Sequence, residues 1–533
     1  MAVNSYNSAA QATIRGCRQD IDRIVTSTRE WTRLIAVIVP ERLPSKVVQE
    51  EVRQPTVMQE KKGKENMMCE IDVVNRAPMG KTQNRLPMSN LNLGTTIWGV
   101  VLACAVLVAW SNPAMAQAGK LDPAFGTGGT FISTAGEFNN TGTFGNVVAL
   151  QSDGKIVAAG QIGFASGLLR LTTNGTLDQS FGNGGVVIIP GSDFSLAQII
   201  GVAIQSDGKI VVGSSNLEAG FGPLFMLARL NVNGSLDTTF DGTGIVETQI
   251  GSFGAAASVL ALQPDGKILL AGQSVMARYD ANGQLDDSFG NGGEAAISVS
   301  GPTAIALQPD GKILLAAGEI VPGTLTGPPG LNLSQIAGII SRYNANGSLD
   351  TSFGASGQAA SVVAASAIAV QTDGVCLSTC KILVGGSTVS SLSINNGNAF
   401  GFGLSRLTSN GSVDATFGTN GVVATTFPSA QPQAVLFAFA LQTNGDIVAG
   451  GTAGHPSAAQ TDFALARYTG NGQLDTAFGS AGTVTTTFGT TQAAISAVAL
   501  QSDGKIVAVG GSQLSPGVPT GKVGFIVTRY LGH

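Results

Sequence analysis

The sequence predicts an all-β fold, a seven-bladed β-propeller made of four-stranded antiparallel blades. Three observations support this prediction. One unit of about 59 residues occurs seven times after residue 120, and each unit contains four short segments typical of β-strands. In addition, the first and last parts of the array are complementary pieces of one unit. Units of this length with four strands each are typical of propellers.

Two motifs and one arginine-ending segment define the unit. The motif N-G-x-[LV]-D-x-x-F recurs at steps of 49 to 64 residues, in truncated form around Asp122 and in full around Asp178, Asp237, Asp286, Asp350, Asp414 and Asp475. The motif LQSDGKIVAAG begins at residue 150 and recurs six times. The third segment supplies every arginine after residue 120: Arg170, Arg229, Arg278, Arg342, Arg406, Arg467 and Arg529.

The four expected strands follow one another within each unit. The apolar run before Gln151 is strand a, and Ser-Asp-Gly then forms a hairpin turn, with Asp starting the turn and Gly taking the positive φ. Strand b begins at Lys155, and strand c is the alternating segment that ends in Arg170. Strand d is the Val/Ile-rich run at 186–189. Strictly alternating or β-branched runs between turn residues are typical of strands.

The two ends of the array favour a closed ring over its main competitor, an open β-rich solenoid. In the six complete units the arginine precedes its aspartate by eight residues, but Arg529 has no such aspartate after it. The lone c–d segment around Asp122 supplies the missing part if its strand d completes the seventh blade. Closure also removes the exposed terminal edges of an open array.

The LD-x-x-F-G and LQ-x-D-G-K-I cores resemble those of the delta-60 repeat family, a predicted β-propeller family of unknown function found on secreted and surface proteins. The resemblance covers roughly residues 119–533. It departs from the pattern at the insertion 375–380 and at Asn444-Gly445-Asp446, which replaces Asp-Gly-Lys. The resemblance implies the fold and an extracytoplasmic setting, and it implies no activity.

The charge distribution divides the chain into two parts. Residues 1–120 hold 15 of the 29 Lys and Arg and 10 of the 34 Asp and Glu, whereas residues 121–533 carry a net charge of −10. An acidic main body argues against nucleic-acid binding, which needs a basic surface. The low charge and the 72 glycines also argue against a coiled coil or a helical array.

An uncharged apolar run at 96–110 predicts an export signal. Its 15 residues are short for a membrane span and suit the apolar core of a signal peptide, so we assign residues 79–116 to a signal cleaved between Ala116 and Gln117. The domain 117–533 is then secreted or held in the cell envelope, with no membrane span after cleavage. Residues 1–78 are expected to be a non-native or disordered extension, and the alternative is an uncleaved signal-anchor with a basic inner tail.

The repeated polar residues each have a structural and a functional interpretation. In each Asp-Gly turn, the Asp side chain is expected to accept a backbone N–H of the same turn and so to stabilise it. The alternative is a ring of calcium sites. The Asp of the first motif is expected to cap a short turn and to pair with the arginine eight residues earlier. Its alternative is a ring of carboxylates that faces the central channel. The Phe three residues after that Asp is expected to pack between blades.

Catalytic and metal-binding residues are scarce. A histidine-dependent site would have to use His455, with Asp462 as its orienting partner, and we interpret His455 as an exposed loop residue. No clustered His/Cys ligands occur, so no cofactor is predicted and calcium is the one metal left open. Cys376 and Cys380 are expected to form a local disulfide at a hairpin tip.

Connections b–c and d–a vary in length and belong to one face of the ring, which we therefore expect to bind a partner. The candidate residues on that face are Asp193, Phe194, Glu218, Phe221, Glu247, Glu319 and His455. The predicted function is a monomeric, non-catalytic binding module for an unknown protein or surface ligand. The alternatives are a carboxylate-dependent lyase or hydrolase at the channel and a structural component of the envelope or matrix.

Overall fold

The computed structural model describes the propeller part of the chain. The described residues are 118–133, 144–162, 165–190, 198–218, 222–250, 255–319, 337–372, 380–390, 399–427, 434–454, 461–488, 491–514 and 524–532. All of them fall in one compact unit, Asn92–His533, and the second unit, Met1–Leu91, lies outside the described residues.

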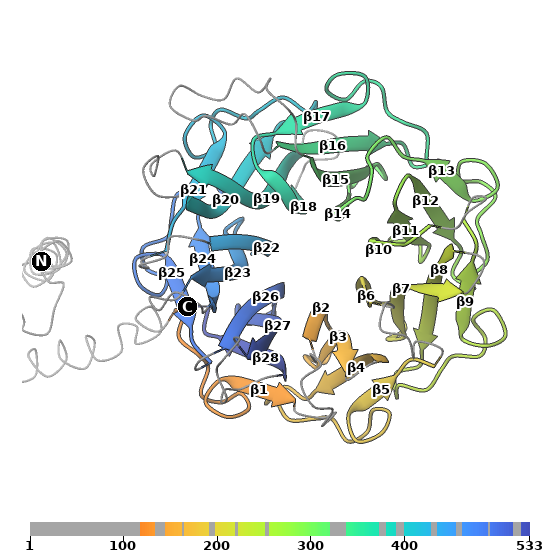
Figure 1. The fold of residues 1–533 in the computed structure, drawn as a ribbon, viewed down its shortest axis with the longest axis horizontal. Helices are drawn as coiled ribbons and strands as arrows, with labels where there is room; N and C mark the ends of the chain where they lie inside the picture. Colours follow the sequence, from red (N-terminus) through yellow and green to blue (C-terminus); the bar gives the residue numbers. More distant parts are fainter. Residues whose placement is uncertain are drawn as a thin grey trace, which may run out of the picture. The chain divides into compact units, whose positions relative to one another are not determined.

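Seven four-stranded antiparallel units form a ring around a central opening (Figure 1). Blade 1 contains β2 (Phe144–Leu150), β3 (Ile156–Ile162), β4 (Ala165–Leu171) and β5 (Val186–Ile188), and blade 2 contains β6 (Gly201–Ile204), β7 (Ile210–Glu218), β8 (Gly222–Leu230) and β9 (Ile245–Thr248). Blade 3 contains β10 (Val259–Leu262), β11 (Ile268–Gly272), β12 (Val275–Tyr279) and β13 (Glu294–Ala296), and blade 4 contains β14 (Ala304–Leu307), β15 (Ile313–Glu319), β16 (Ala337–Tyr343) and β17 (Gln358–Ser361).

The remaining three blades follow the same order from the innermost strand to the outermost. Blade 5 contains β18 (Ala364–Gln371), β19 (Lys381–Ser390), β20 (Ala399–Leu407) and β21 (Val422–Thr425). Blade 6 contains β22 (Ala434–Leu441), β23 (Ile447–Gly454), β24 (Thr461–Tyr468) and β25 (Thr483–Thr486). Blade 7 contains β26 (Thr491–Leu500), β27 (Ile506–Leu514), β28 (Gly524–Tyr530) and β1 (Thr130–Ser133). Blades 6 and 7 share one sheet because Thr461 and Gln492 form a parallel pair between β24 and β26.

The N-terminal strand completes the last blade. β1 pairs antiparallel with β28, from Thr130 opposite Thr528 to Ser133 opposite Phe525. The predicted fold class is confirmed, including closure by the orphan first segment, and the open solenoid is excluded. The physical reason is that β28 would otherwise present an unpaired edge, which β1 covers.

The apolar core is divided among the blade junctions. Seven hydrophobic clusters are present, and each contains buried side chains from two neighbouring blades. The cluster that joins blade 7 to blade 1 contains Val509 and Phe525 together with Ile156 and Leu169. Because every blade packs on two neighbours, including across the closure, the ring has no end that lacks a partner.

Glycines make the tight parts of the blade possible. Gly154 has φ 83° in the turn between β2 and β3, a conformation that costs glycine little. In β3, a Cβ on Gly160 would lie 1.9 Å from the carbonyl oxygen of Phe144, where β2 bulges between Gly145 and Val147. The bulge therefore needs glycine on the neighbouring strand.

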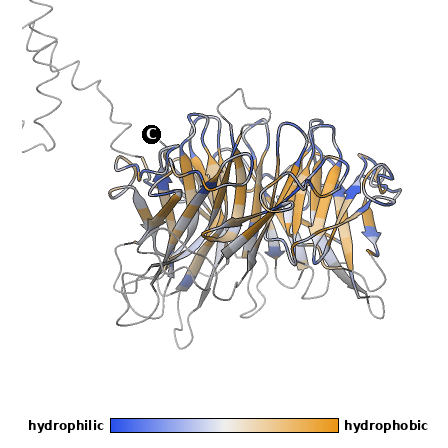
Figure 2. Cartoon of the chain, turned by 90° about the horizontal axis from the view of Figure 1, so that it is seen from above, coloured by the Kyte–Doolittle hydropathy of each residue, from blue (hydrophilic) through white to orange (hydrophobic). Residues whose placement is uncertain are grey.

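The two faces of the ring differ. The connections between the first and second and between the third and fourth strands gather on one face and are hydrophilic, while the strands are largely apolar (Figure 2). We call this the turn face, and the opposite face, from which the b–c and d–a connections leave, the loop face. No helix within the described ranges has the length and apolar character needed to cross a membrane.

Candidate functional site

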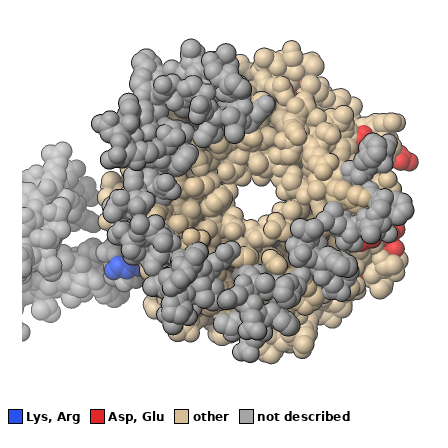
Figure 3. Space-filling view, viewed as in Figure 1, with Lys and Arg blue, Asp and Glu red and all other residues tan. Residues whose placement is uncertain are grey.

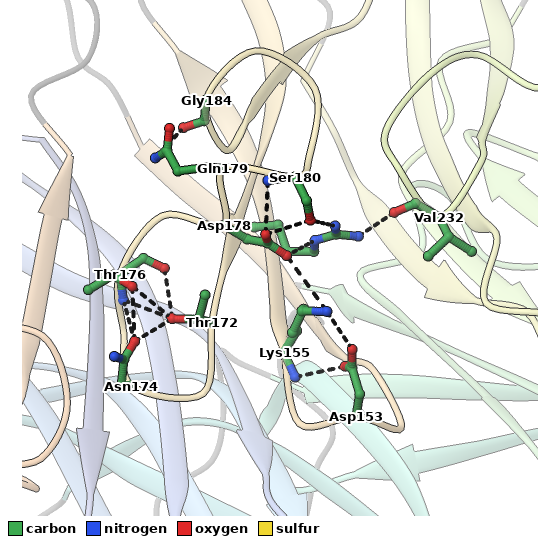
Figure 4. A network of polar contacts seen from close by, with 11 residues as sticks. Asp153, Lys155, Thr172, Asn174, Thr176, Asp178, Gln179, Ser180, Gly184 and Val232 are labelled. Atoms are coloured by element: carbon green, nitrogen blue, oxygen red, sulfur yellow. Dashed lines mark hydrogen bonds and ion pairs between the residues drawn. The ribbon is translucent and has the colours of Figure 1, made fainter.

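A network of polar side chains surrounds Asp178 in blade 1 (Figure 4). Arg170 donates from Nε to Asp178 Oδ2 at 2.9 Å, and Ser180 donates from Oγ to Asp178 Oδ1 at 2.7 Å. Arg170 also donates through Nη1 to the carbonyl of Val232, which belongs to blade 2. Lys155 lies 3.8 Å from the same carboxylate. One buried ion pair thus links the outer part of a blade to the neighbouring blade.

The same arrangement is present at all seven junctions. The distance from arginine Nε to aspartate Oδ2 is 2.6 to 2.9 Å in every blade. The arginine Cζ lies 4.4 to 4.8 Å from the ring centre of the Phe three residues after the aspartate. The carbonyls that accept from arginine Nη1 belong to Val232, Ala281, Ala345, Ser409, Gly470, Gly532 and Thr173.

Each arginine is therefore held by a carboxylate, a carbonyl and an aromatic ring. The seven phenylalanines are fully buried, and each belongs to a junction cluster: Phe125, Phe181, Phe240, Phe289, Phe353, Phe417 and Phe478. A guanidinium is suited to this position because it can bond in its plane while its face stacks on the ring. These contacts lie at the junctions, so the seven carboxylates do not form a ring that faces the channel.

A lysine adds a second cation in six blades, from the Asp-Gly-Lys turn in five of them and from Lys381, after the insertion 375–380, in blade 5. Its Nζ lies 2.8 to 3.9 Å from the carboxylate of the motif aspartate. Blade 6 has Asp446 at this position, and Asp475 there is paired only with Arg467 among the ion pairs of the described residues. The Asp475 side chain is 23% exposed, against 4 to 12% for its six equivalents.

Five carboxyl groups of the network have a lowered pKa. Burial alone would raise the pKa of Asp414, but hydrogen bonds from Thr416 and Lys381 and the charge of Arg406 outweigh it and lower the pKa to about 2. Hydrogen bonds from Lys267 and Ser288 lower the pKa of Asp286 well below its ordinary value. The pKa values of Asp178, Asp237 and Asp350 are lowered in the same way, against the opposing effect of burial. A carboxyl group that stays ionised at neutral pH cannot serve as a general acid.

The Asp-Gly turns use their aspartates internally. Asp153 accepts the backbone N–H of Lys155 at Oδ1, and four further turns repeat this bond at 3.0 to 3.2 Å. Within the described ranges, no three His, Cys, Asp or Glu side chains gather where they could hold a metal ion. The oxygen that a calcium ion would need at each turn is thus already a hydrogen-bond acceptor for the chain itself.

The central channel is the second candidate site. The view in Figure 3 shows the opening, and no described charged side chain borders it there. The seven innermost strands, β2, β6, β10, β14, β18, β22 and β26, contain no charged residue. Phe437 in β22 is 41% exposed and lies at a bulge, where β2, β18 and β26 have Asn146, Ser366 and Ser496. The described wall of the channel is thus uncharged, with one exposed aromatic ring.

The sequence-predicted binding residues fall into two groups. Glu218 and Glu319 end β7 and β15 on the loop face, and Glu247 lies in β9, an outermost strand away from the channel. The other four lie outside the described residues: Asp193, Phe194, Phe221 and His455. Ala116, Gln117 and Cys376 also lie outside them. Cys380 is buried and disulfide-bonded, and its pairing with Cys376 stays a prediction.

Sequence reasoning paired each arginine with its aspartate but did not foresee the other members of the network. The lysine contact, the hydroxyl two residues after the aspartate and the carbonyl of the next blade were all missed. The recurrence of lysine in the turn motif, with Asp446 as its only acidic replacement, was the available signal. Phe437 was also missed, although it is a large aromatic residue where three other blades have Asn146, Ser366 and Ser496.

Fold and network together define a β-propeller whose repeated charges serve the junctions between blades. Six of its segments match the family model described as a β-propeller domain of unknown function, DUF5122. The matched residues are 151–181, 205–240, 263–289, 333–353, 381–417 and 442–478. These six segments are therefore similar to the DUF5122 β-propeller model. A comparison with curated proteins gave no match.

Several solved structures share the propeller architecture at low identity. Virginiamycin B lyase from Staphylococcus aureus is 13% identical over 75% of this chain and 98% of its own, with a TM-score of 0.40. A polysaccharide lyase of family PL25, an ulvan lyase, is 11% identical over 74% of this chain and 95% of its own, with a TM-score of 0.41. Similarity at this level carries no inference about activity or substrate.

Proposed function

We propose that this chain is an exported, non-catalytic β-propeller that binds a partner at the cell surface or outside the cell through its loop face. We also propose that its repeats are of the delta-60 type, on the two motif cores described above. The observation that carries this proposal is that the repeated charged residues and the connections of variable length lie in different parts of the ring. The motif arginines and aspartates are engaged at the junctions, while the b–c connections, whose length differs most between blades, leave from the opposite face.

The strand boundaries support this separation of constant turns from variable connections. In six blades the second strand begins six residues after the first one ends, as Ile156 does after Leu150. The b–c connections do not keep a length: β12 begins at Val275 after β11 ends at Gly272, but β16 begins at Ala337 after β15 ends at Glu319. Turns of constant geometry serve the fold, and connections free to vary are where recognition is built.

The proposal does not use the network as a catalytic site. Its aspartates are paired with arginine, and its arginines are buried at 2 to 8% exposure. A substrate would have to displace an interblade ion pair to reach them, and breaking such a buried pair costs about 3–5 kcal/mol. The uncharged inner strands likewise supply no acid or base from the described wall of the channel.

The test compares three versions of residues 117–533 as bait against envelope and extracellular extract of the source organism. The first is the natural sequence. In the second, the connection between Glu319 and Ala337 is cut to the length of the one between Gly272 and Val275. The third carries Ser152→Arg, Ser206→Arg and Ser502→Arg, three exposed substitutions on the turn face.

We expect a partner that the first and third versions retain and the second loses. Equal capture by all three versions, or loss only with the turn-face variant, would contradict binding through the loop face. Export is checked separately by N-terminal sequencing of the protein from the extracytoplasmic fraction, where Gln117 is the expected first residue.

A further inference from the structure

We propose that closure of the ring blocks removal of the signal, so that cleavage has to come first. This inference rests on the proposed export and on the predicted cleavage between Ala116 and Gln117. Residues 118–122, which begin at the second residue after that bond, are part of the closed ring.

Residues 118–122 are bonded to the C-terminal end of the propeller. Gly119 donates its N–H to the carbonyl of Leu531, and Leu531 donates its own to the carbonyl of Lys120, both at 2.8 Å. Asp122 donates its N–H to the carbonyl of Arg529 at 2.8 Å. The Asp122 side chain then receives Arg529 Nε at 2.9 Å and Nη2 at 2.8 Å. The segment is thus an edge of blade 7.

Ala118 occupies the position in its blade junction that Asn233, a residue in the middle of the array, occupies in another junction. Its carbonyl accepts the N–H of Gly479 at 2.9 Å, as the carbonyl of Asn233 accepts that of Gly182 at 2.8 Å. Ala118 is 4% exposed and belongs to the junction cluster that contains Phe478. The second residue after the predicted cleavage bond is therefore buried and hydrogen-bonded, as if it stood in the middle of the array.

A peptidase needs the chain on both sides of the bond free and extended, and folded segments are cut only through an opened state. Because Ala118 and Gly119 are paired and buried in the closed ring, the peptidase and blades 6 and 7 compete for the same residues. A precursor that closes first keeps its signal, and a precursor that is cut first is free to close.

The topology delays burial of the residues next to the cleavage site. Asp122 and Arg529 are 407 residues apart, so residues 119–122 lack their partners Arg529 and Leu531 until the C-terminal end has emerged. At synthesis rates of about 5–20 residues per second, this interval is roughly 20–80 s. Ring closure through the first segment, rather than through a hairpin within the last blade, thus delays burial of the processing site until the whole array is made.

The test uses the full chain and purified signal peptidase in detergent micelles. Precursor diluted from urea directly into the reaction is compared with precursor that was first refolded. We expect cleavage after Ala116 in the diluted sample and cleavage at least about tenfold slower in the refolded one. Equal rates would overturn the inference, while absence of cleavage in both samples would overturn the signal assignment together with it.

Two variants make the test specific to closure. Asp122→Asn loosens the first segment, and Asp178→Asn weakens the same network in blade 1, so only the former is expected to speed cleavage of the refolded precursor. A Thr130→Cys, Thr528→Cys pair would join β1 to β28 where these residues face each other. We expect its oxidised form to resist cleavage and reductant to restore it, relative to natural precursor treated with the same reductant. Cleavage of the oxidised form at the natural rate would contradict the proposal.

Discussion

Asp122 and Arg529 form a buried ion pair across 407 residues of sequence, with Arg529 Nε 2.9 Å from Asp122 Oδ2. The six equivalent pairs join residues that are eight apart. The geometry is the same, but only this pair holds the two ends of the array together. The ring therefore closes with the interaction that it repeats within every other blade.

Asp122→Asn and Asp178→Asn each leave a buried guanidinium without its carboxylate. We expect each to lower the free energy of unfolding by about 3–5 kcal/mol, measured as a shift of the urea midpoint. Limited proteolysis separates the two, because only Asp122→Asn frees the segment next to β1. Equal proteolysis near residue 118 in both variants would show that the closing pair has no special role.

Asp446→Lys restores to blade 6 the cation that the other six blades have. The new ammonium would face Asp475, whose side chain is 23% exposed, so we expect a gain of about 0.5–1 kcal/mol in the free energy of unfolding. The matched change is Lys267→Asp, which removes the 2.8 Å contact to Asp286 and places a second carboxylate beside it. This variant should be destabilised, and a gain from it would contradict the role given to the lysines.

The lowered pKa values predict tolerance to acid. An aspartate whose pKa falls on folding stabilises the fold above its unfolded value, here 3.8, and loses that contribution as the pH drops through the folded value. For Asp414 the folded pKa is about 2. The melting temperature should therefore stay level from pH 7 to about 4 and fall between pH 3.8 and 2. The difference between natural protein and Asp414→Asn should shrink over that interval, and a constant difference would contradict it.

Truncation of Phe417 is expected to lower the free energy of unfolding strongly, and truncation of Phe437 is expected to change it little. Phe417 is fully buried between blades 5 and 6, so Phe417→Ala should cost about 3–5 kcal/mol in a urea unfolding experiment. Phe437 is 41% exposed at the channel, and Phe437→Ser gives blade 6 the residue type of β18 and β26, so the expected change is within about 0.5 kcal/mol. A cost above about 2 kcal/mol for Phe437→Ser would show that the ring is part of the core.

The architecture could be predicted because the spacing of residues within one unit specifies its turns and strands. Each Asp-Gly turn fixes a hairpin, and each apolar run between turns is long enough for one strand. The spacing of eight positions from Arg170 to Asp178 predicts their pairing, since both lie at the same end of neighbouring segments of one blade. Because the same pattern of turns and strands occurs seven times, a prediction that would be weak for one unit becomes strong for the array.

The sequence by itself thus determined the number of blades, their four strands, the closing segment and the arginine–aspartate pairs. Only the tertiary structure decided what those pairs touch. The carbonyl that Arg170 reaches belongs to Val232, 62 residues away in the next blade, and the wall of the channel is set by which edge of each blade turns inward. Such contacts depend on how whole blades pack, and no spacing within one unit specifies the orientation of its neighbour.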